Sequence, residues 1–271
     1  TIAKKYLFHN SVHIFRPLWS YEAQKKGSEI ILYFYSTNII SLKIKNENHI
    51  QDSIWHIANW PKYWGWNKSQ KSFIKQSVVS SCDFNIKGII PFSTPLKFKP
   101  ININSKKIRL LVFDVQPTEN YVYNSLGLSV EYYTEDNCID FLNKINLLAI
   151  EFNLDVYIKR KRPTNNISKK YIKKLRFLLS TPIWNEIPPD YDPDLACELV
   201  KPFASISMPF TSTGMIASYK KVPSVYFDNL ESLDETFHVN SSVQFISGFE
   251  NLKKWMLNCL RNQQNNDKHF D

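Results

Sequence analysis

The amino-acid sequence predicts an α/β protein with parallel sheets in two domains. Residues 6–35 have the residue types of a strand, a helix and a second strand, and residues 204–228 repeat that order. Between them, residues 109–115 form a continuous apolar run, which is typical of a strand buried on both faces. Parallel strands need a crossover connection, usually a helix, so each strand-helix-strand unit implies a parallel sheet.

The first domain opens with a strand at residues 6–8, a helix at about 17–26 and a strand at 30–35. Pro17 suits a first helical turn, Gly27 suits a helix end, and the second strand is β-branched and aromatic. These residues form one fragment of a Rossmann-like domain. The opening strands of such a domain are not in the sequence, so we expect the N-terminal domain to be incomplete.

A cluster of aromatic residues follows at 51–79. It contains Trp55, Trp60, Tyr63, Trp64, Trp66 and Phe73. Trp is large and usually mostly buried, so a packed core is favoured over a platform on which sugars stack. Residues 78–90 have an extended pattern and lead into a Pro-containing connector at 91–100, where we place the domain boundary. We expect an N-terminal domain at 1–100, a C-terminal domain at 101–262 and a disordered tail at 263–271.

The second domain is predicted to alternate strands and helices. In chain order these are a strand at 109–115, a helix capped by Thr134, a strand at 155–158, a helix from Ser168 to 179, and a helix at 194–200. The unit at 204–228 adds a strand at 204–208, a hydroxyl-rich turn at 209–214, a helix at 215–221 and a strand at 225–227. A last amphipathic helix is predicted at about 249–260.

The formal net charge of +9 indicates an anionic partner. A phosphate-bearing substrate and an acidic membrane surface both fit, whereas no RNA-recognition, helix-turn-helix or zinc-finger pattern supports nucleic acid. The lysines at 169–174 are interpreted as the solvated face of a helix. No apolar run is long enough for a membrane span, so an integral membrane protein is not expected.

The sequence lacks the motifs of several classes of functional site. The four cysteines are far apart and have no metal-ligand spacing, and histidines are scarce. We therefore expect free thiols in a reducing cytoplasm, no metal and no cofactor. Walker A and GxGxxG motifs are absent, so a P-loop kinase and a dinucleotide enzyme are poorly supported, and there is no GxSxG elbow.

Three loops follow strands of the second domain at their carboxyl ends, where ligands of open parallel sheets collect. The first carries Asp114 and Glu119. The second carries four cations, Lys159, Arg160, Lys161 and Arg162. The third brings hydroxyls to a helix start and consists of Pro209, Phe210, Thr211, Ser212 and Thr213. These groups suit a phosphodiester or a diphosphate, and a solvated loop is the alternative for the cationic run.

The chain resembles bacterial surface-polysaccharide biosynthesis proteins that are named for a Pro-Phe-Thr-Ser motif, here Pro209 to Ser212. The other matching stretches are RPLWSYEAQKKGSEIILYFYSTN (16–38), the tryptophan-rich stretch around 60–70, FDVQP (113–117), YYTEDN (132–137) and the basic strand end before Pro163. The resemblance covers most of residues 1–230, and the order and spacing of these short motifs make it specific.

The resemblance implies a GT-B-type glycosyltransferase, in which two Rossmann-like domains face each other and the C-terminal one holds a nucleotide-sugar. It also implies a distant similarity to transferases that use CMP-activated ulosonic acids, in which a Ser/Thr turn at a helix start grips phosphate and carboxylate. That role falls here to Thr211, Ser212 and Thr213, with Arg16 as a further substrate-binding candidate. Those relatives often use a His-Pro pair near the leaving phosphate, whereas this sequence has cations before Pro163.

Under this hypothesis the cations and the turn stabilise charge on the leaving nucleotide without a metal. A carboxylate should take the proton of the acceptor, and Glu22 is the first candidate, with Asp114 and Glu119 as second choices. An exposed Glu22 paired with Lys25 or Lys26 is the structural alternative. The expected partners are a nucleotide-sugar donor, a glycan or lipid-linked glycan acceptor, and an acidic membrane surface on the inner face of the cytoplasmic membrane. The rival functions are a sugar-nucleotide epimerase of the same shape and a non-catalytic basic binding module.

Overall fold

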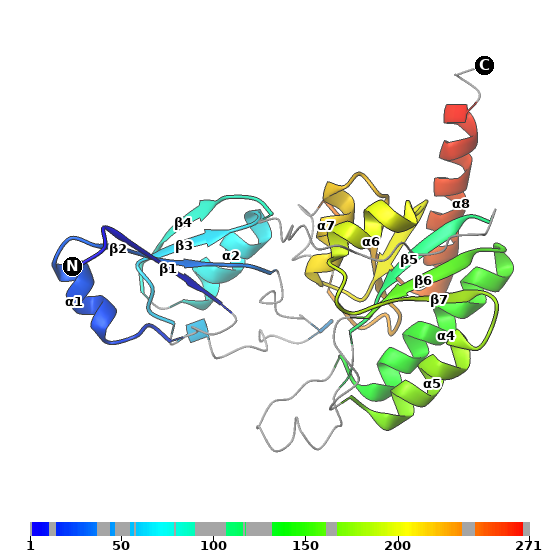
Figure 1. The fold of residues 1–271 in the computed structure, drawn as a ribbon, viewed down its shortest axis with the longest axis horizontal. Helices are drawn as coiled ribbons and strands as arrows, with labels where there is room; N and C mark the ends of the chain where they lie inside the picture. The colour runs from blue at the N-terminus through cyan, green and yellow to red at the C-terminus, as the bar shows by residue number, and fades with distance from the viewer. Residues whose placement is uncertain are drawn as a thin grey trace. The chain divides into compact units, whose positions relative to one another are not determined.

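The computed structural model describes residues 2–10, 15–36, 44–46, 55–56, 58–78, 80–89, 107–115, 117, 132–160, 167–234 and 242–267, with side chains as far as 262. The chain divides into two compact units, one formed by Thr1–Pro91 and Asp234–Ser241 and the other by Phe92–Leu233 and Ser242–Asp271. Each unit contains a parallel sheet with helices packed on it, as the sequence predicts (Figure 1). The predicted connector at 91–100 lies outside the described residues, so its role as domain boundary stays a prediction.

The first unit contains a four-stranded parallel sheet in the order β1-β2-β3-β4. Its elements are β1 (Lys5–His9), α1 (Trp19–Lys25), β2 (Glu29–Tyr33), β3 (Lys62–Gly65), α2 (Lys68–Ser77) and β4 (Asp83–Ile86). The predicted strand-helix-strand unit is confirmed, with slightly different ends. The strand β3 and the helix α2 lie in the stretch that the sequence predicts only as an aromatic cluster, because the dense aromatic pattern hides the change from strand to helix. Within the described part of the predicted extended stretch at 78–90, the strand is β4.

The aromatic cluster is the packed core of the first unit, as predicted. Five of its side chains are at most 3% exposed, and these are Trp55, Trp60, Tyr63, Trp66 and Phe73. Trp64 differs because it is half-buried, and the ammonium groups of Lys5 and Lys87 lie 5.4 and 5.1 Å from its ring centroid. The aromatic residues therefore stabilise the fold of this unit chiefly by burial.

The second unit contains a six-stranded parallel sheet in the order β10-β9-β8-β5-β6-β7. Its elements are β5 (Arg109–Phe113), α4 (Glu135–Glu151), β6 (Asp155–Lys159), α5 (Lys169–Leu179), β7 (Trp184–Ile187), α6 (Pro193–Val200), β8 (Ala204–Ser207), α7 (Ser212–Tyr219), β9 (Ser224–Asp228), β10 (Gln244–Ser247) and α8 (Phe249–Asp267). The chain builds outward from β5 to β7 and then returns to place β8 on the other side of β5. The direction of winding therefore reverses between β5 and β8, which is where ligands of such sheets bind.

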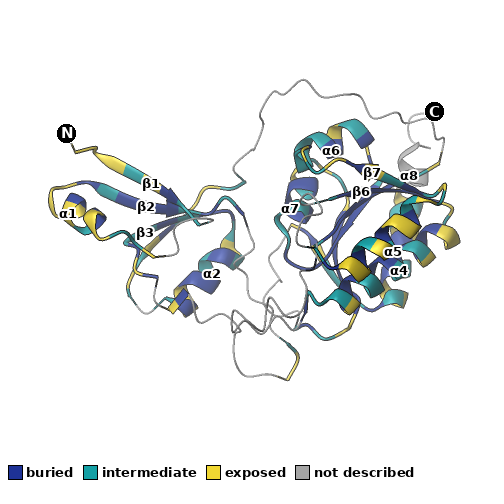
Figure 2. Ribbon diagram, turned by 60° about the horizontal axis from the view of Figure 1, so that its bottom comes forward, coloured by how far each residue is buried: buried dark blue, intermediate teal, exposed yellow. Residues whose placement is uncertain are grey.

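Helices cover both faces of this sheet, and its central strands are buried between them (Figure 2). On one face, Leu111 and Phe113 of β5 pack in a buried cluster with Cys197 of α6 and Ala217 of α7. On the other face, Phe141 of α4 contacts a side chain of β9, and α4 packs against α5. The apolar strands that the sequence predicts are thus buried on both faces, as expected for a parallel sheet.

The sequence misses the two edge strands of this sheet, β7 and β10. Both are only four residues long, and β10 is partly exposed along its length. Prolines stand just before and just after β7, which weakens a strand pattern in the sequence. Edge strands pair on one side only, so their residues carry a weaker apolar signal than those of central strands.

Two helices differ from their predicted bounds. The helix α7 begins at Ser212 instead of residue 215, so part of the predicted turn is the first helical turn. The helix α8 continues to Asp267, where the sequence predicts a disordered tail from 263. The added residues include no Gly or Pro, and their ordinary helix propensity extends a helix already held at its start. Residues 268–271 lie outside the described part of the chain.

The carboxyl group of Asp228, at the end of β9, is fully buried and joins several elements. It accepts hydrogen bonds from the hydroxyl of Tyr132 (2.9 Å), the amide of Leu233 (2.9 Å) and the hydroxyl of Ser247 (3.2 Å). Burial and the adjacent Asp228 raise the pKa of Tyr132 well above its ordinary value, so its hydroxyl stays protonated and donates. This contact holds the segment before α4 against the ends of β9 and β10.

We predict that Tyr132→Phe lowers the free energy of unfolding by about 2 kcal/mol, because the buried carboxyl group of Asp228 loses one of its donors. Urea denaturation followed by circular dichroism measures the change. Tyr219→Phe is the matched control, since Tyr219 is 71% exposed, and it should change stability by less than about 0.5 kcal/mol. Equal effects of the two substitutions would contradict the role assigned to this hydrogen bond.

Candidate functional site

The candidate site lies at the carboxyl ends of β5 and β8, where the winding of the second sheet reverses. Asp114 follows β5 directly, and Met208, Pro209 and Phe210 follow β8 and lead into α7. Because all strands of the sheet are parallel, these segments emerge at the same edge. The turn between β8 and α7 is the best defined part of this edge.

Phe210 gives the turn an unusual backbone. Its φ angle is 65°, which lies in the left-handed region that bulky L-residues rarely adopt. Its ring is only 3% exposed, stacks on Phe245 with centroids 5.8 Å apart, and meets the edge of Tyr226 at 5.7 Å. Burial of the ring offsets the cost of the strained backbone. Strain of this kind persists only where the surrounding structure enforces it, and it concentrates at functional sites.

Two tyrosine hydroxyls hold the main chain on either side of Phe210. Tyr133, just before α4, donates to the carbonyl oxygen of Pro209. Tyr226 of β9 donates to the carbonyl oxygen of Thr211 at 2.8 Å. Burial raises the pKa of Tyr226 well above its ordinary value, so its hydroxyl remains a donor. These two residues position the turn, and the sequence gives no signal for their role because both contacts are long-range.

The start of α7 presents polar groups that suit an anion. Thr211 is the N-cap residue, but its side chain accepts no hydrogen bond from the first amides of the helix. Its hydroxyl donates to the carbonyl oxygen of Met208 at 3.2 Å, and the hydroxyl of Thr213 donates to that of Thr211 at 3.1 Å. Thr211, Ser212 and Thr213 are half-buried. The first amides of α7 and the positive end of the helix dipole therefore favour negative charge at this point.

Gly214 lets α7 lie close to the sheet. A Cβ atom at this position would lie 2.7 Å from the hydroxyl oxygen of Ser207 and 2.8 Å from the Cε1 atom of Tyr226. Both distances are too short for real contacts, so the absence of a side chain sets how near the helix start comes to β8 and β9. The sequence predicts that Gly214 is part of a turn. In the structure it lies in α7, where close packing against β8 and β9 leaves no room for a side chain.

Asp114 is buried, with 5% of its surface exposed. Its Oδ2 atom accepts a hydrogen bond of 2.6 Å from the hydroxyl of Tyr171, which lies in the first turn of α5. Burial, followed by the nearby Asp114, raises the pKa of Tyr171 well above its ordinary value. This hydrogen bond holds the Asp114 side chain against α5.

The first two cations of the run after β6 are engaged inside the unit. The ammonium group of Lys159 donates to the carbonyl oxygens of Arg160 (2.6 Å) and Pro189 (3.2 Å), and burial lowers its pKa. Arg160 forms an ion pair with Glu186 of β7. These contacts join the ends of β6 and β7. Lys161 and Arg162, the other two predicted cations, lie outside the described residues.

The family described as "Polysaccharide biosynthesis PFTS motif protein" matches residues 1–256. The chain belongs to this family. Within the PFTS motif, Pro209 accepts a bond from Tyr133, Phe210 carries the strained backbone, Thr211 is the N-cap residue of α7, and Ser212 is its first residue.

No curated protein matches the chain. Among solved structures, a crystal structure of a mutant TarM of S. aureus, in complex with fondaparinux, α-GlcNAc-glycerol and UDP, is similar with a TM-score of 0.50 and 10% sequence identity. The match covers 90% of this chain and 47% of that chain, so the chain spans about half the length of TarM. This likeness confirms the predicted fold class, a GT-B-type pair of Rossmann-like domains with parallel sheets.

The other predicted residues of this PFTS protein lie in the first unit or outside the described chain. Arg16 donates to the hydroxyl of Ser20 at 2.9 Å and lies 3.9 Å from the ring centroid of Tyr21. Glu22 is exposed and pairs with Lys25 at 2.8 Å, and this hydrogen bond lowers its pKa. Arg16 and Glu22 thus lie in the first unit and contact residues of that unit. Glu119 lies outside the described residues.

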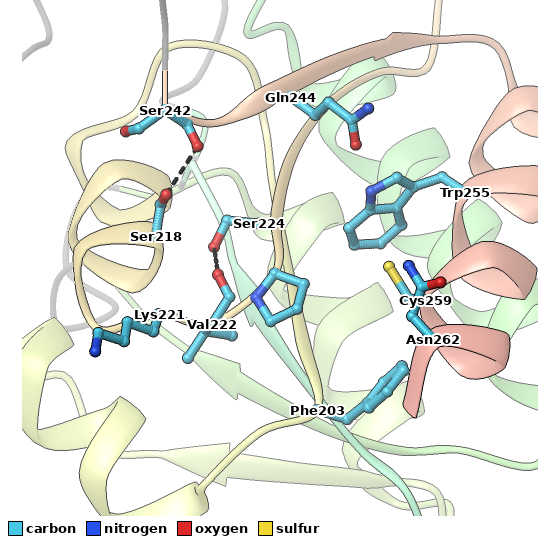
Figure 3. Close-up of a pocket in the computed structure, with 11 residues that line it drawn as sticks. Phe203, Ser218, Lys221, Val222, Ser224, Ser242, Gln244, Trp255, Cys259 and Asn262 are labelled. Carbon is cyan, nitrogen blue, oxygen red and sulfur yellow. Dashed lines mark hydrogen bonds between the residues drawn. The ribbon is translucent and has the colours of Figure 1, made fainter. Parts of the chain in front are cut away.

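A separate hollow of about 790 Å³ lies at the opposite edge of the second sheet, next to the starts of β8, β9 and β10 (Figure 3). Trp255 of α8 and Gln244 of β10 line it. Two of its serine hydroxyls, on Ser218 and Ser224, donate to main-chain carbonyl oxygens at 2.8 and 2.7 Å. This hollow is not part of the candidate site, because the PFTS turn stands at the carboxyl edge.

Within the described residues, no group of three or more His, Cys, Asp or Glu side chains could hold a metal ion. Over the same part of the chain, no helix has both the length and the apolar character needed to cross a membrane.

We predict that Gly214→Ala lowers the free energy of unfolding by about 1–2 kcal/mol, although Ala has the higher helix propensity, because the added methyl group overlaps Ser207 and Tyr226. Thermal and urea denaturation measure the effect. Ser207→Ala alone should be close to neutral, since the Ser207 hydroxyl is buried without a hydrogen-bond partner in the described structure. The double substitution should recover part of the loss, and strict additivity of the two changes would contradict the contact.

Proposed function

We propose that this PFTS protein is a glycosyltransferase of bacterial surface-polysaccharide biosynthesis and that the start of α7 holds the phosphate of its nucleotide-sugar donor. Membership of the polysaccharide biosynthesis family and the GT-B-type fold support the class of reaction. The TarM structure contains UDP, and that observation supports a nucleotide donor by analogy alone.

The start of α7, where the side chain of the N-cap residue Thr211 makes no capping hydrogen bond, carries the proposal. It joins three features at the winding reversal of the second sheet: a helix dipole, adjacent hydroxyls and a turn that is fixed before any ligand arrives. Thr211, Ser212 and Thr213 are the proposed phosphate-binding residues. Pro209 and Phe210 act by holding the main chain in place. A site that is already ordered pays little reorganisation cost when charge develops on the leaving phosphate.

The proposed reaction uses no metal. Helix amides, hydroxyl groups and cations stabilise the negative charge that forms on the leaving nucleotide. Lys161 and Arg162 are the proposed ligand cations of the basic run, while Lys159 and Arg160 are engaged by groups at the end of β7. A CMP-activated ulosonic acid is one proposed donor, since a phosphate and a carboxylate both suit a helix start with several hydroxyls.

The acceptor is a glycan or a lipid-linked glycan, and a carboxylate takes the proton from its attacking hydroxyl. Glu22, Asp114 and Glu119 are the proposed bases. The hydrogen bond of Asp114 with Tyr171 keeps one of its oxygens engaged, so this residue fits a positioning role better than direct proton transfer. Glu22 is solvent-exposed, and its ion pair with Lys25 has to open before its carboxylate accepts a proton.

We predict that one nucleotide among CMP, UDP and GDP binds in isothermal titration calorimetry and that Ser212→Ala weakens its binding about tenfold. The expected cause is the loss of a hydroxyl donor to a charged phosphate oxygen, while the helix amides remain.

Ser180→Ala is the matched control, because Ser180 is an exposed serine at the end of α5, away from the PFTS turn. The affinity of the Ser180→Ala protein for the same nucleotide should equal that of the unmodified protein. If none of the three nucleotides binds, the proposed donor site is wrong. If Ser212→Ala leaves the affinity unchanged, the turn is not part of that site.

A further inference from the structure

The helix α5 carries an outward face of one charge sign. Its eleven residues include five cations and no carboxylate: Lys169, Lys170, Lys173, Lys174 and Arg176. Its buried face is formed by Tyr171, Leu175 and Leu178. At helical spacing, Lys169, Lys173 and Arg176 fall on the side opposite to those buried residues.

Apolar side chains lie among these cations. Phe177 follows Arg176 and is 62% exposed, which is unusual for a large aromatic residue. Ile167 and Ile172 line a shallow hollow of about 340 Å³ together with Lys169, Lys173 and Arg176. The outward face of α5, here defined as Lys169, Ile172, Lys173, Arg176 and Phe177, therefore combines cations with exposed apolar surface.

Carboxylates of α4 lie near one edge of this face. Lys170, at the edge of the face, pairs with Asp136 of α4 at 2.5 Å. Among the described residues, no carboxylate lies within ion-pair distance of Lys173 or Arg176. This pattern differs from an ordinary solvated helix, in which charges of both signs alternate along the surface.

We propose that the outward face of α5 docks this protein on a bilayer that contains anionic phospholipid. The lysines and the arginine lie against the headgroup phosphates, and Phe177 enters the boundary between headgroups and acyl chains. Exposed Phe177 and the two isoleucines favour a lipid surface over a nucleic acid, whose phosphate backbone would contact the cations alone. The net charge of +9 suits an anionic surface.

The docking surface is independent of the proposed donor site. It lies on the helix that follows β6, whereas the PFTS turn follows β8. A vesicle assay needs no nucleotide, so failure of lipid binding leaves the donor site intact and failure of nucleotide binding leaves the docking surface intact.

The test is co-sedimentation of the full chain with vesicles of phosphatidylcholine mixed with phosphatidylglycerol, and with vesicles of phosphatidylcholine alone. We expect binding to the mixed vesicles only. Lys173→Gln combined with Arg176→Gln should lower the partition coefficient about 25-fold, at about fivefold per cation. Phe177→Ser should lower it about tenfold, and this loss should persist at high salt because burial of an apolar ring is not screened.

Matched controls exist on other helices of the same unit. Lys254→Gln combined with Arg261→Gln removes the same charge from exposed positions of α8, and Tyr219→Ser removes an aromatic ring that is 71% exposed on α7. Both controls should bind the mixed vesicles within about twofold of the unmodified protein. Neither changes a residue of the outward face of α5, and charge far from the membrane contributes little. Circular dichroism should show the same melting temperature for every variant.

Three results would overturn the proposal. One is equal binding to vesicles with and without phosphatidylglycerol. Another is an equal loss in the α5 variants and in their controls, which would make binding a property of total charge. The third is tighter binding of a DNA duplex than of vesicles, with the duplex affinity lost in the double variant and kept in Phe177→Ser.

Discussion

The segment at 132–137 holds the carboxyl edge of the second sheet together, and the candidate site depends on that constraint. Tyr132 donates to the buried carboxyl group of Asp228 at the end of β9, and Tyr133 donates to the carbonyl oxygen of Pro209 at the end of β8. Asn137 accepts a hydrogen bond from the side chain of Asn229, the residue after β9. One short stretch thus fixes two strand ends and the start of α4, and it holds the turn that leads into α7.

The PFTS turn combines strain with tight packing. Phe210 adopts a left-handed backbone that costs of order 1–3 kcal/mol, and burial of its ring against Phe245 and Tyr226 offsets that cost. Gly214 then allows the first turn of α7 to lie directly on β8 and β9. The result is a helix start whose amides point to one place without needing a ligand to organise them, which is the property that binding of a leaving phosphate requires.

The positive charges of the chain serve different purposes at different places. Lys159 and Arg160 look alike in the sequence as members of one basic run, yet both are engaged by groups of their own unit, Lys159 with main-chain carbonyl oxygens and Arg160 with Glu186. The cations on α5 look like an ordinary solvated helix face, yet Lys173 and Arg176 lie beside exposed Phe177 and face no carboxylate in the described chain. A cluster of charge in a sequence therefore does not tell which charges are available to a ligand.

The sequence by itself determined the features that depend on residues close together in the chain. Thr134 and Ser168 cap their helices as predicted, each accepting a hydrogen bond from the amide three residues on, and the helix from 169 to 179 has the predicted ends. The continuous apolar run at 109–115 identified the central strand, and short motifs in order identified the family. Only the tertiary structure decided the edge strands, the early start of α7 and the roles of Tyr133 and Gly214. Each of these depends on contacts between residues far apart in the chain, and periodicity, capping and turn preference carry no information about such contacts.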